Sequence, residues 1–489
     1  MSYKHGVKVS EVPTSLLPPV ESSAGIPVIV GTAPVNMADV ENVNKPVLCH
    51  TYDDAVKAFG YVPAKETASG LKKFEYSISE FIQSQFGLFG VKPVIIINVL
   101  DPKTHKVTAT TTSVTLDTKT GSATIEETGI LPDSVSFGDG YTKDTDYVVA
   151  FDEDGKLVIT STKDTDGSFK CETGKALTFA ADKVDPTKVE ADDVIGGVDT
   201  DGNASGLELI NECFPRFRLV PGLIIAPGYS SNAGVAATMA AKCANINETF
   251  KCKCIIDVPT DTVKNYSAVA EWKNANNITD ASQIVCWPGV ALDGTFYHMS
   301  TQLAGLIGKT DSEHGDVPFV SPSNHKFQMT AAVLADGEEV FLGQDKAAYL
   351  NGQGIVTALN SMNGWTCWGN RTAAYPGNTD VKDAFIPVAR MFAWVGNTII
   401  QTFWSKVDGP LNRRHIDSIV DSLNVWLNGL TAKEYILGGR VEFLESENPT
   451  TDLMDGKATF HVYLTPASPN KEMDFVLEYD PQYINTLFA

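Results

Sequence analysis

Apolar residues follow two alternating patterns over the first hundred positions. The run GIPVIVGTAP, which begins at Gly25, predicts a buried strand, and TYDDAVKAFG at residues 51–60 predicts a short helix. Before Gly90, apolar side chains recur every three or four positions, as in an amphipathic helix: Phe74, Ile78, Phe81, Ile82 and Phe86. The apolar strand PVIIINVL follows. Uninterrupted strands of this kind are typical of a sheet covered on both faces.

The same alternation of strand and helix resumes after residue 203. PGLIIAPG, CKCIIDVP and SQIVCWPG predict strands, and NAGVAATMAAKCANIN and VKNYSAVAEWKNA predict the helices between them. Strands that alternate with helices favour a parallel sheet with right-handed crossovers. We therefore expect one sheet built from the segments on either side of residues 101–203.

Residues 101–203 have a different pattern and a different charge. Thr-rich stretches such as VTATTTSVT and KLVITS alternate polar with apolar side chains, and Asp-Gly steps at 139, 154 and 166 suit tight turns. Positions 101–200 hold 20 Asp and Glu against 10 Lys, which is −10 of the chain's net charge of −22. The segment is predicted to be a small acidic all-β domain inserted into the larger fold.

The last third predicts helices at about 382–405 and 410–430, followed by the strands GGRVEFLES and ATFHVYLT. At both ends of the chain, apolar residues alternate with polar ones, as in an extended segment. Val7 and Val9 do so near the start, and Phe475, Leu477 and Tyr479 do so in MDFVLEY. Because a lone strand leaves its backbone unpaired, such an arm either stays disordered or adds to a sheet edge, including one on another chain.

These patterns predict an α+β multidomain fold, in line with about three domains for 489 residues. An α/β body carries an inserted small all-β domain, and a C-terminal α+β domain follows. The expected boundaries are an N-terminal arm at 1–20, the body at 21–100 and 204–345, the inserted domain at 101–203, the C-terminal domain at 346–470 and a C-terminal arm at 471–489.

Composition excludes several classes of protein. With 43% hydrophobic and 20% charged residues, the chain resembles ordinary folded proteins rather than disordered ones. Its net charge of −22 repels phosphate backbones and anionic lipid surfaces, so we expect no nucleic-acid partner. No run of 18 apolar residues predicts a membrane span, and no signal peptide is evident, so we expect no membrane insertion. The eight cysteines are accordingly expected to be reduced and mostly buried.

Candidate chemistry is sparse. GLIGKT at Gly305–Thr310 resembles the end of a phosphate-binding loop, but Leu303 stands where such a loop needs glycine, and the run lies on a predicted helix. The turns FDEDG, KDTDG and VDTDG lack the ligand spacing of calcium loops. Cys252 and Cys254 are spaced C-x-C in an apolar strand, which favours a core strand over a zinc site. We expect no catalytic residue, metal or cofactor, although a catalytic triad assembled only in the folded chain remains an alternative.

The order of segments resembles the tail sheath proteins of contractile phage tails, bacteriocins and related injection systems. The opening GVKVSEVPTSLLPPVESSAGIPVIVGTAPVNM with NKPVLCHTYDDAVKAFG is similar to that family, as is PGLIIAPGYSSNAGVAATMAAKC with IIDVPTD. LAGLIGKTDSEHGDVPFVSPSN, AAYLNGQGIVTAL, WGNRTA, FIPVARMF and DSIVDSLNVWLNGL resemble later segments. The resemblance covers about four fifths of the chain, all but the acidic segment.

The resemblance implies a structural motor rather than an enzyme. Subunits of this family stack as hexameric rings in a helical assembly around a tail tube, held between baseplate and tail terminator proteins. Such a virion or tail-like particle is assembled in a bacterial cytoplasm. A metastable extended sheath contracts and drives the tube through a cell envelope without consuming nucleotide. Extended arms donate strands to neighbouring subunits, and the matching residues here are Val7, Val9, Val12, Phe475, Leu477 and Tyr479.

The inserted domain is expected to face outward. We hypothesise that Arg413, Arg414 and Asp417 contact the tube, because adjacent basic residues in so acidic a chain offer weak, breakable charge contacts. An ordinary solvated helix face is an equal alternative. Two other classes stay open: an α/β enzyme with an acidic β appendage, and another self-assembling tail or surface-layer protein.

Overall fold

A computed structural model describes residues 19–38 and 40–488. Its centre is an eight-stranded sheet in the order β2-β5-β1-β16-β17-β18-β22-β23. Six neighbouring strands from β5 to β22 are parallel, while β2 and β23 are antiparallel edge strands. The strands are β1 (Pro27–Gly31), β2 (Pro46–Cys49), β5 (Val94–Asn98), β16 (Leu223–Ile225), β17 (Lys253–Asp257), β18 (Gln283–Cys286), β22 (Ile355–Ser361) and β23 (Gly364–Trp368). Strands from both sides of residues 101–203 therefore share one parallel sheet, as predicted.

Helices cover both faces of this sheet. In β1, Val28 and Val30 belong to one buried cluster and Ile29 to the other, because successive side chains of a strand point to opposite faces. One face carries α4 (Ile210–Phe217), α5 (Ala233–Ala244) and α6 (Tyr266–Ala275); the other carries α1 (Tyr52–Phe59), α2 (Ser77–Ile82) and α7 (Met299–Glu313). Helix α8 (Gln344–Gly352) packs on β22.

The helix predicted to end at Gly90 does end there, with Gly90 at a left-handed φ of 68°. Only its first part is an α-helix, however, since Gln83–Phe89 forms a π-helix. A smaller sheet lies beside the main one, in the order β21-β19-β20-β4-β3. Its strands are β3 (Lys65–Glu66), β4 (Lys72–Lys73), β19 (Gly289–Leu292), β20 (Thr295–Tyr297) and β21 (Ala331–Val333).

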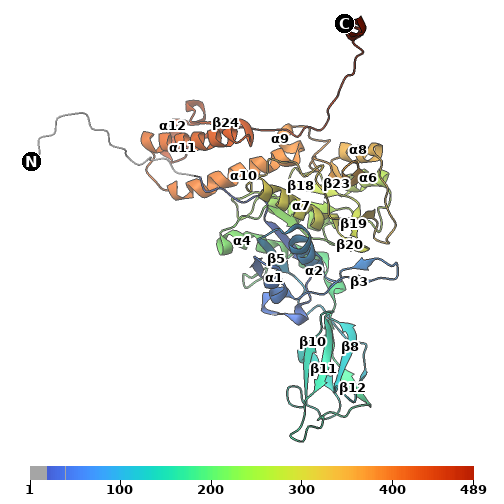
Figure 1. Ribbon diagram of the computed structural model, residues 1–489. Helices are drawn as coiled ribbons and strands as arrows, with labels where there is room; N and C mark the ends of the chain where they lie inside the picture. The colour runs from blue at the N-terminus through green and yellow to red at the C-terminus, as the bar shows by residue number, and fades with distance from the viewer. Residues whose placement is uncertain (1–18, 39, 489) are drawn as a thin grey trace, which may run out of the picture.

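The acidic segment folds into short antiparallel strands, as its alternation predicts. Its sheets are β10-β11-β8, β7-β12-β9, β13-β6 and β14-β15. They comprise β6 (Lys106–Thr108), β7 (Ser113–Thr115), β8 (Ser122–Thr128), β9 (Ser136–Phe137), β10 (Tyr147–Phe151), β11 (Lys156–Ser161), β12 (Ala176–Ala180), β13 (Asp182–Val184) and β14 (Gly197–Val198), with the short helix α3 (Ala191–Ile195). The partner of β14, β15 (Ala204–Ser205), lies just beyond residue 203. Leu116, Phe137 and Leu157 belong to a buried cluster of this segment's own residues. Figure 1 shows β8, β10, β11 and β12 at the end of the molecule farthest from α11.

The C-terminal third contains both predicted helices, α10 (Ile386–Phe403) and α11 (Arg413–Ala432), with the short α9 (Val381–Ala384) before them. Trp394 of α10 packs on Trp426 of α11 with ring centroids 5.6 Å apart. The strands β24 (Ile436–Glu442) and β25 (His461–Pro466) form a two-stranded antiparallel sheet against α11, and α12 (Thr450–Met454) lies in their connection. Figure 1 shows these elements together at one end of the molecule.

The two predicted arms differ in how much of them is described. Val7, Val9 and Val12 lie outside the described residues. After β25 the chain leaves the body, as Figure 1 shows, and residues 471–480 pair with no strand among the described residues. The expectation of an extended end is corrected for Pro481–Phe488, which forms a 3₁₀ helix. Asp480 accepts a hydrogen bond from Gln482 N at 2.9 Å, which favours a helical turn there.

Candidate functional site

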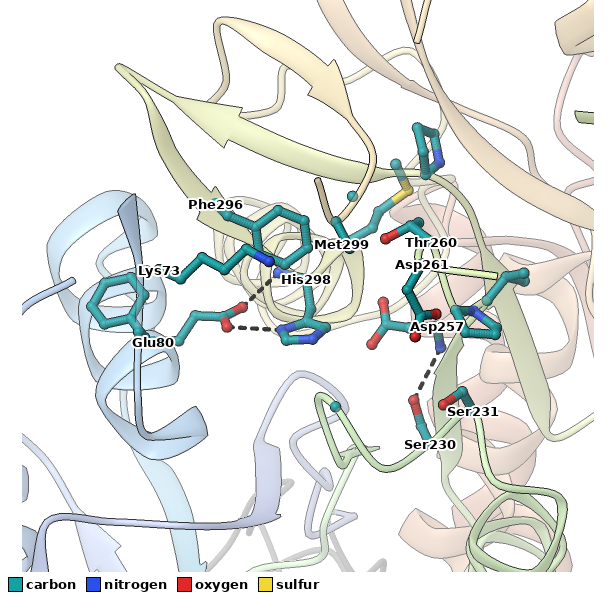
Figure 2. Close-up of a pocket in the computed structure, with 17 residues that line it drawn as sticks. Lys73, Glu80, Ser230, Ser231, Asp257, Thr260, Asp261, Phe296, His298 and Met299 are labelled. Carbon is teal, nitrogen blue, oxygen red and sulfur yellow. Dashed lines mark hydrogen bonds and ion pairs between the residues drawn. The ribbon is translucent and has the colours of Figure 1, made fainter. Parts of the chain in front are cut away.

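The structure has a polar cavity of about 400 Å³ at the carboxyl ends of the parallel strands. Its wall includes Ser230 after β16, Asp257 at the end of β17 and Gly289 after β18. This edge of an open α/β sheet is where such folds bind ligands. Figure 2 shows Glu80 of α2 bonded to His298 on one side of the cavity, and Asp257 and Ser230 on the other side.

Glu80 and His298 form a tight pair at the start of α7. His298 Nδ1 lies 2.8 Å from Glu80 Oε2, and Glu80 Oε1 accepts from His298 N at 2.7 Å and from Thr301 Oγ1 at 2.6 Å. Burial alone lowers the pKa of His298, but the Glu80 carboxylate outweighs this effect and raises the pKa to about 9. The imidazole is therefore a cation at neutral pH.

Asp257 holds the same helix end from the other side. Its Oδ1 accepts from Ser300 N at 2.9 Å, and its Oδ2 accepts from the Ser300 hydroxyl. Burial raises the pKa of this carboxyl group, although His298 and the hydrogen bonds from Ser300 oppose that shift. Two carboxylates thus cap the positive end of α7, with the His298 cation between them, which is a favourable arrangement for a buried helix N-terminus.

The geometry accounts for this cluster as a helix cap. A hydrolytic triad needs a serine hydroxyl bonded to a histidine ring nitrogen. Here the Ser300 hydroxyl donates to Asp257, and Ser230 Oγ accepts from Asp257 N at 3.1 Å. Among the described residues, the His298 ring forms a hydrogen bond with Glu80 only.

Two of the sequence motifs that suggested other chemistry, the GLIGKT run and the C-x-C pair, lie in segments that are mostly buried. Leu303 and the GLIGKT run are inside α7, as expected, and most of that helix is buried. All eight cysteines are free and buried, and Cys252 Sγ contacts Cys243 Sγ at 3.3 Å. In the described part of the chain, no group of three or more His, Cys, Asp or Glu is arranged to hold a metal ion. Nor is any described helix long and apolar enough to cross a membrane.

The two edges of the sheet β24–β25 differ, because a side chain caps the β24 edge at one residue. Val441 N and O, on the outer edge of β24, both bond to the side chain of Asn424. Val441 is opposite Val462 and Gly439 is opposite Leu464, so by antiparallel alternation the backbone groups of Val462 and Leu464 point away from β24. Within the described residues, no backbone hydrogen bond reaches that outer edge of β25. The sheet can therefore accept a further strand beside β25.

The proposed tube-contact residues come together on one turn of α11. Arg413 Nε lies 3.3 Å from Asp417 Oδ2, and Arg413, Arg414 and Asp417 are all exposed. Phe475, Leu477 and Tyr479 are exposed on the C-terminal segment, far from Arg413 along the chain. The structure gives these two sets no contact with each other.

Sequence reasoning missed the Glu80–His298 pair and the Asn424 cap. Glu80 had a detectable signal in the sequence, because this charged residue stands beside the apolar residues Phe81 and Ile82 in a helix. The structure shows that all three residues are buried. Asn424 had none, because its partner Val441 is 17 positions away and its role depends on how β24 packs.

Comparison with known proteins gives relatives of one kind, although no family model matches the chain. It is 27% identical over 501 residues to the tail sheath protein of Burkholderia phage BcepMu, covering 99% of this chain and 98% of that protein. It is 26% identical to a putative prophage major tail sheath protein of Pseudomonas aeruginosa, covering 61% and 75%, and 26% identical to the tail sheath protein of Escherichia phage P2, covering 60% and 72%.

Solved structures share the fold. A chain of the anti-feeding prophage baseplate superposes with a TM-score of 0.58 and 14% identity, covering 98% of this chain and 100% of that one. A chain of the PVC extracellular contractile injection system sheath in its contracted state gives a TM-score of 0.58 and 14% identity, covering 99% of each. The resemblance of this chain to contractile tail sheath proteins, indicated by its sequence, is therefore confirmed by relatives that carry that name.

Proposed function

We propose that this chain is the structural subunit of a contractile tail sheath, polymerising as stacked hexameric rings around a tail tube. The observation that carries the proposal is the end-to-end similarity to the BcepMu tail sheath protein, which leaves little of either chain without a counterpart. The extended sheath is metastable and contracts to drive the tube through a cell envelope. The energy is stored in packing during assembly, so no nucleotide or cofactor is needed.

The arms link neighbouring subunits by strand addition. Residues Val7, Val9 and Val12 of one arm, and Phe475, Leu477 and Tyr479 of the other, pair with sheets of adjacent copies. Phe475 is 78% exposed and Leu477 is 95% exposed. Exposure of such apolar side chains to water is unfavourable, and burial against a partner would remove them from water. The open edge of β25 supports a specific acceptor, because strand addition needs a row of unpaired backbone groups.

Other contacts follow from the same assembly. Arg413, Arg414 and Asp417 meet the tail tube, and baseplate and tail terminator proteins bind the two ends of the helical stack. Residues 101–203 form a separate domain that faces outward, which its acidic surface and its place at the end opposite α11 support (Figure 1). The particle is a virion or a tail-like particle assembled in a bacterial cytoplasm.

Negative-stain electron microscopy of the purified chain across a range of concentrations tests this function. We expect hollow striated cylinders from the full chain and none after deletion of residues 1–20 or with Leu477→Asp. The matched control is Val198→Asp, because Val198 is also an exposed apolar residue but lies in the segment proposed to face outward. Monodisperse particles at every concentration, with and without a purified tail tube, would contradict the proposal and favour the α/β enzyme alternative.

A further inference from the structure

The segment Val20–Gly25, which we call the strap, lies along helix α10 between the N-terminal residues and β1. Val20 N donates to Thr402 Oγ1 at 3.0 Å, and Ser22 N donates to Thr398 Oγ1 at 3.2 Å. Two backbone N–H groups of the strap thus donate to threonine hydroxyls that lie one helical turn apart on α10.

The hydrogen bonds between the strap and α10 continue toward the N-terminus of the helix. Trp394 Nε1 donates to Ser22 O, and Arg390 Nη2 donates to Ala24 O at 3.1 Å. The four helical positions, 390, 394, 398 and 402, are spaced by four residues. Four residues of an α-helix rise about 6 Å and two residues of an extended chain span about 6.6 Å. The spacing of the N–H groups of Val20 and Ser22 therefore matches that of Thr402 and Thr398. The spacing of the carbonyl groups of Ser22 and Ala24 likewise matches that of Trp394 and Arg390.

The end of the strap next to β1 is fixed most firmly. Arg390 also pairs with Asp311 of α7, and both side chains are almost completely buried. A Cβ atom on Gly222 would lie 1.9 Å from Ala24 O, so the strap presses directly on the body at this point. One arginine therefore ties the strap, the C-terminal helix α10 and the body helix α7 together.

The second C-terminal helix holds the other end. Trp426 Nε1 of α11 donates to Glu21 Oε1 at 3.1 Å, and the Trp426 ring packs on Trp394. The strap is thus bonded to both helices, whereas the chain enters the central sheet only at Pro27.

We propose that the strap is a mechanical anchor, which passes tension on the N-terminal arm to α10 and α11 before it can reach β1. The inference rests on the proposed function, because the arm carries tension only when another copy holds it. The arm leaves the strap at the Thr402 end, so a pull along the chain axis loads the successive hydrogen bonds together rather than one at a time. The central sheet then keeps its register while the arm is pulled.

Single-molecule pulling on the monomer tests the anchor without any assembly. Handles are attached at the N-terminus and, through an unnatural amino acid, at exposed position 425 of α11. The test variant is Thr398→Val with Thr402→Val. The matched control is Thr238→Val with Thr431→Val, since these hydroxyls bond only to carbonyls four residues earlier on α5 and α11.

In the test variant we expect the first unfolding step at no more than half the force of the first step in the wild type and control. Amide hydrogen exchange at Val20 and Ser22 should rise at least tenfold in the test variant alone. Equal forces and equal exchange in all three proteins would overturn the anchor. Failure of the chain to form cylinders would instead refute the sheath function and leave the monomer result intact.

Discussion

The side chain of Asn424 accepts a hydrogen bond from Val441 N at 2.8 Å and donates one to Val441 O at 3.1 Å. A carboxamide has one donor group and one acceptor group, so Asn424 satisfies the β24 edge as a neighbouring strand would. Edge strands with free backbone groups invite pairing with other chains. Helix α11 therefore caps the β24 edge at Val441, whereas no such cap is present on the described β25 edge.

The first prediction is that Asn424→Leu removes the cap from the β24 edge. Loss of both hydrogen bonds leaves the Val441 backbone partly buried and unpaired, which should lower the free energy of unfolding by about 1–2 kcal/mol. Amide exchange at Val441 should rise, and purified monomer should form irregular oligomers by light scattering. Asn428→Leu is the control, because Asn428 is exposed on the same helix. Equal exchange at Val441 in both variants would refute the role of Asn424.

The second prediction concerns pH. The folded pKa of His298, about 9, lies above the ordinary value of 6.5, so its proton stabilises the fold fully below pH 6.5 and this contribution is lost as pH rises to 9. Glu80 and Asp257 favour the cation and Lys73 opposes it. We expect stability to urea to fall between pH 6.5 and 8 by at most about 1.4 kcal/mol per pH unit.

A second buried group sets the upper limit of the pH range in which stability should fall. Lys273, whose pKa burial lowers to about 8, acts in the opposite sense above that pH, because the folded state releases its proton first. Glu80→Gln removes the carboxylate that raises the pKa of His298 and should flatten the slope. His50→Gln should not, since His50 is exposed and outside the cavity. An unchanged slope in Glu80→Gln would refute the assignment.

Much of the central sheet was predictable because its strands are buried on both faces. A strand such as Val94–Asn98, all of it buried, has to be apolar at nearly every position, and that signal survives without tertiary information. The π-helix Gln83–Phe89 was not predictable, because apolar spacings of three and four fit α- and π-turns equally over seven residues. Strand β4 has two residues, too few to show an alternating pattern, and it pairs both with β3 and with Thr295, more than 200 positions away.

The candidate site was less predictable than the fold. Helix ends and sheet edges are completed by side chains from distant segments, as Asp257 completes the start of α7 at Ser300. The strap left a partial signal, since Arg390, Thr398 and Thr402 recur at multiples of four within a mostly apolar helix. Their extended partner could be found only in the folded chain.

The third prediction tests the outward position of residues 101–203. Replacement of residues 109–181, which contain the whole buried cluster of this segment, by a short Gly-Ser linker should leave cylinders intact and reduce the outer diameter in negative stain. The two ends can be joined, because Thr108 and Asp182 are paired across β6 and β13. The main sheet should persist, since its strands lie outside the deleted segment. Loss of cylinders from a monomer with unchanged thermal stability would place this segment in the contacts between subunits.

The last prediction concerns Arg413 and Arg414, the first two residues of α11. Positive charge at a helix N-terminus opposes the helix dipole, and the exposed pair of Arg413 with Asp417 adds little stability. Arg413→Glu with Arg414→Glu should therefore keep or slightly raise the melting temperature of the monomer, yet abolish assembly that depends on the tail tube. Lys103→Glu with Lys119→Glu matches the charge change on exposed residues of the acidic segment and should still assemble. If the arginine variant assembles on the tube as well as this control does, the two arginines form an ordinary solvated helix face.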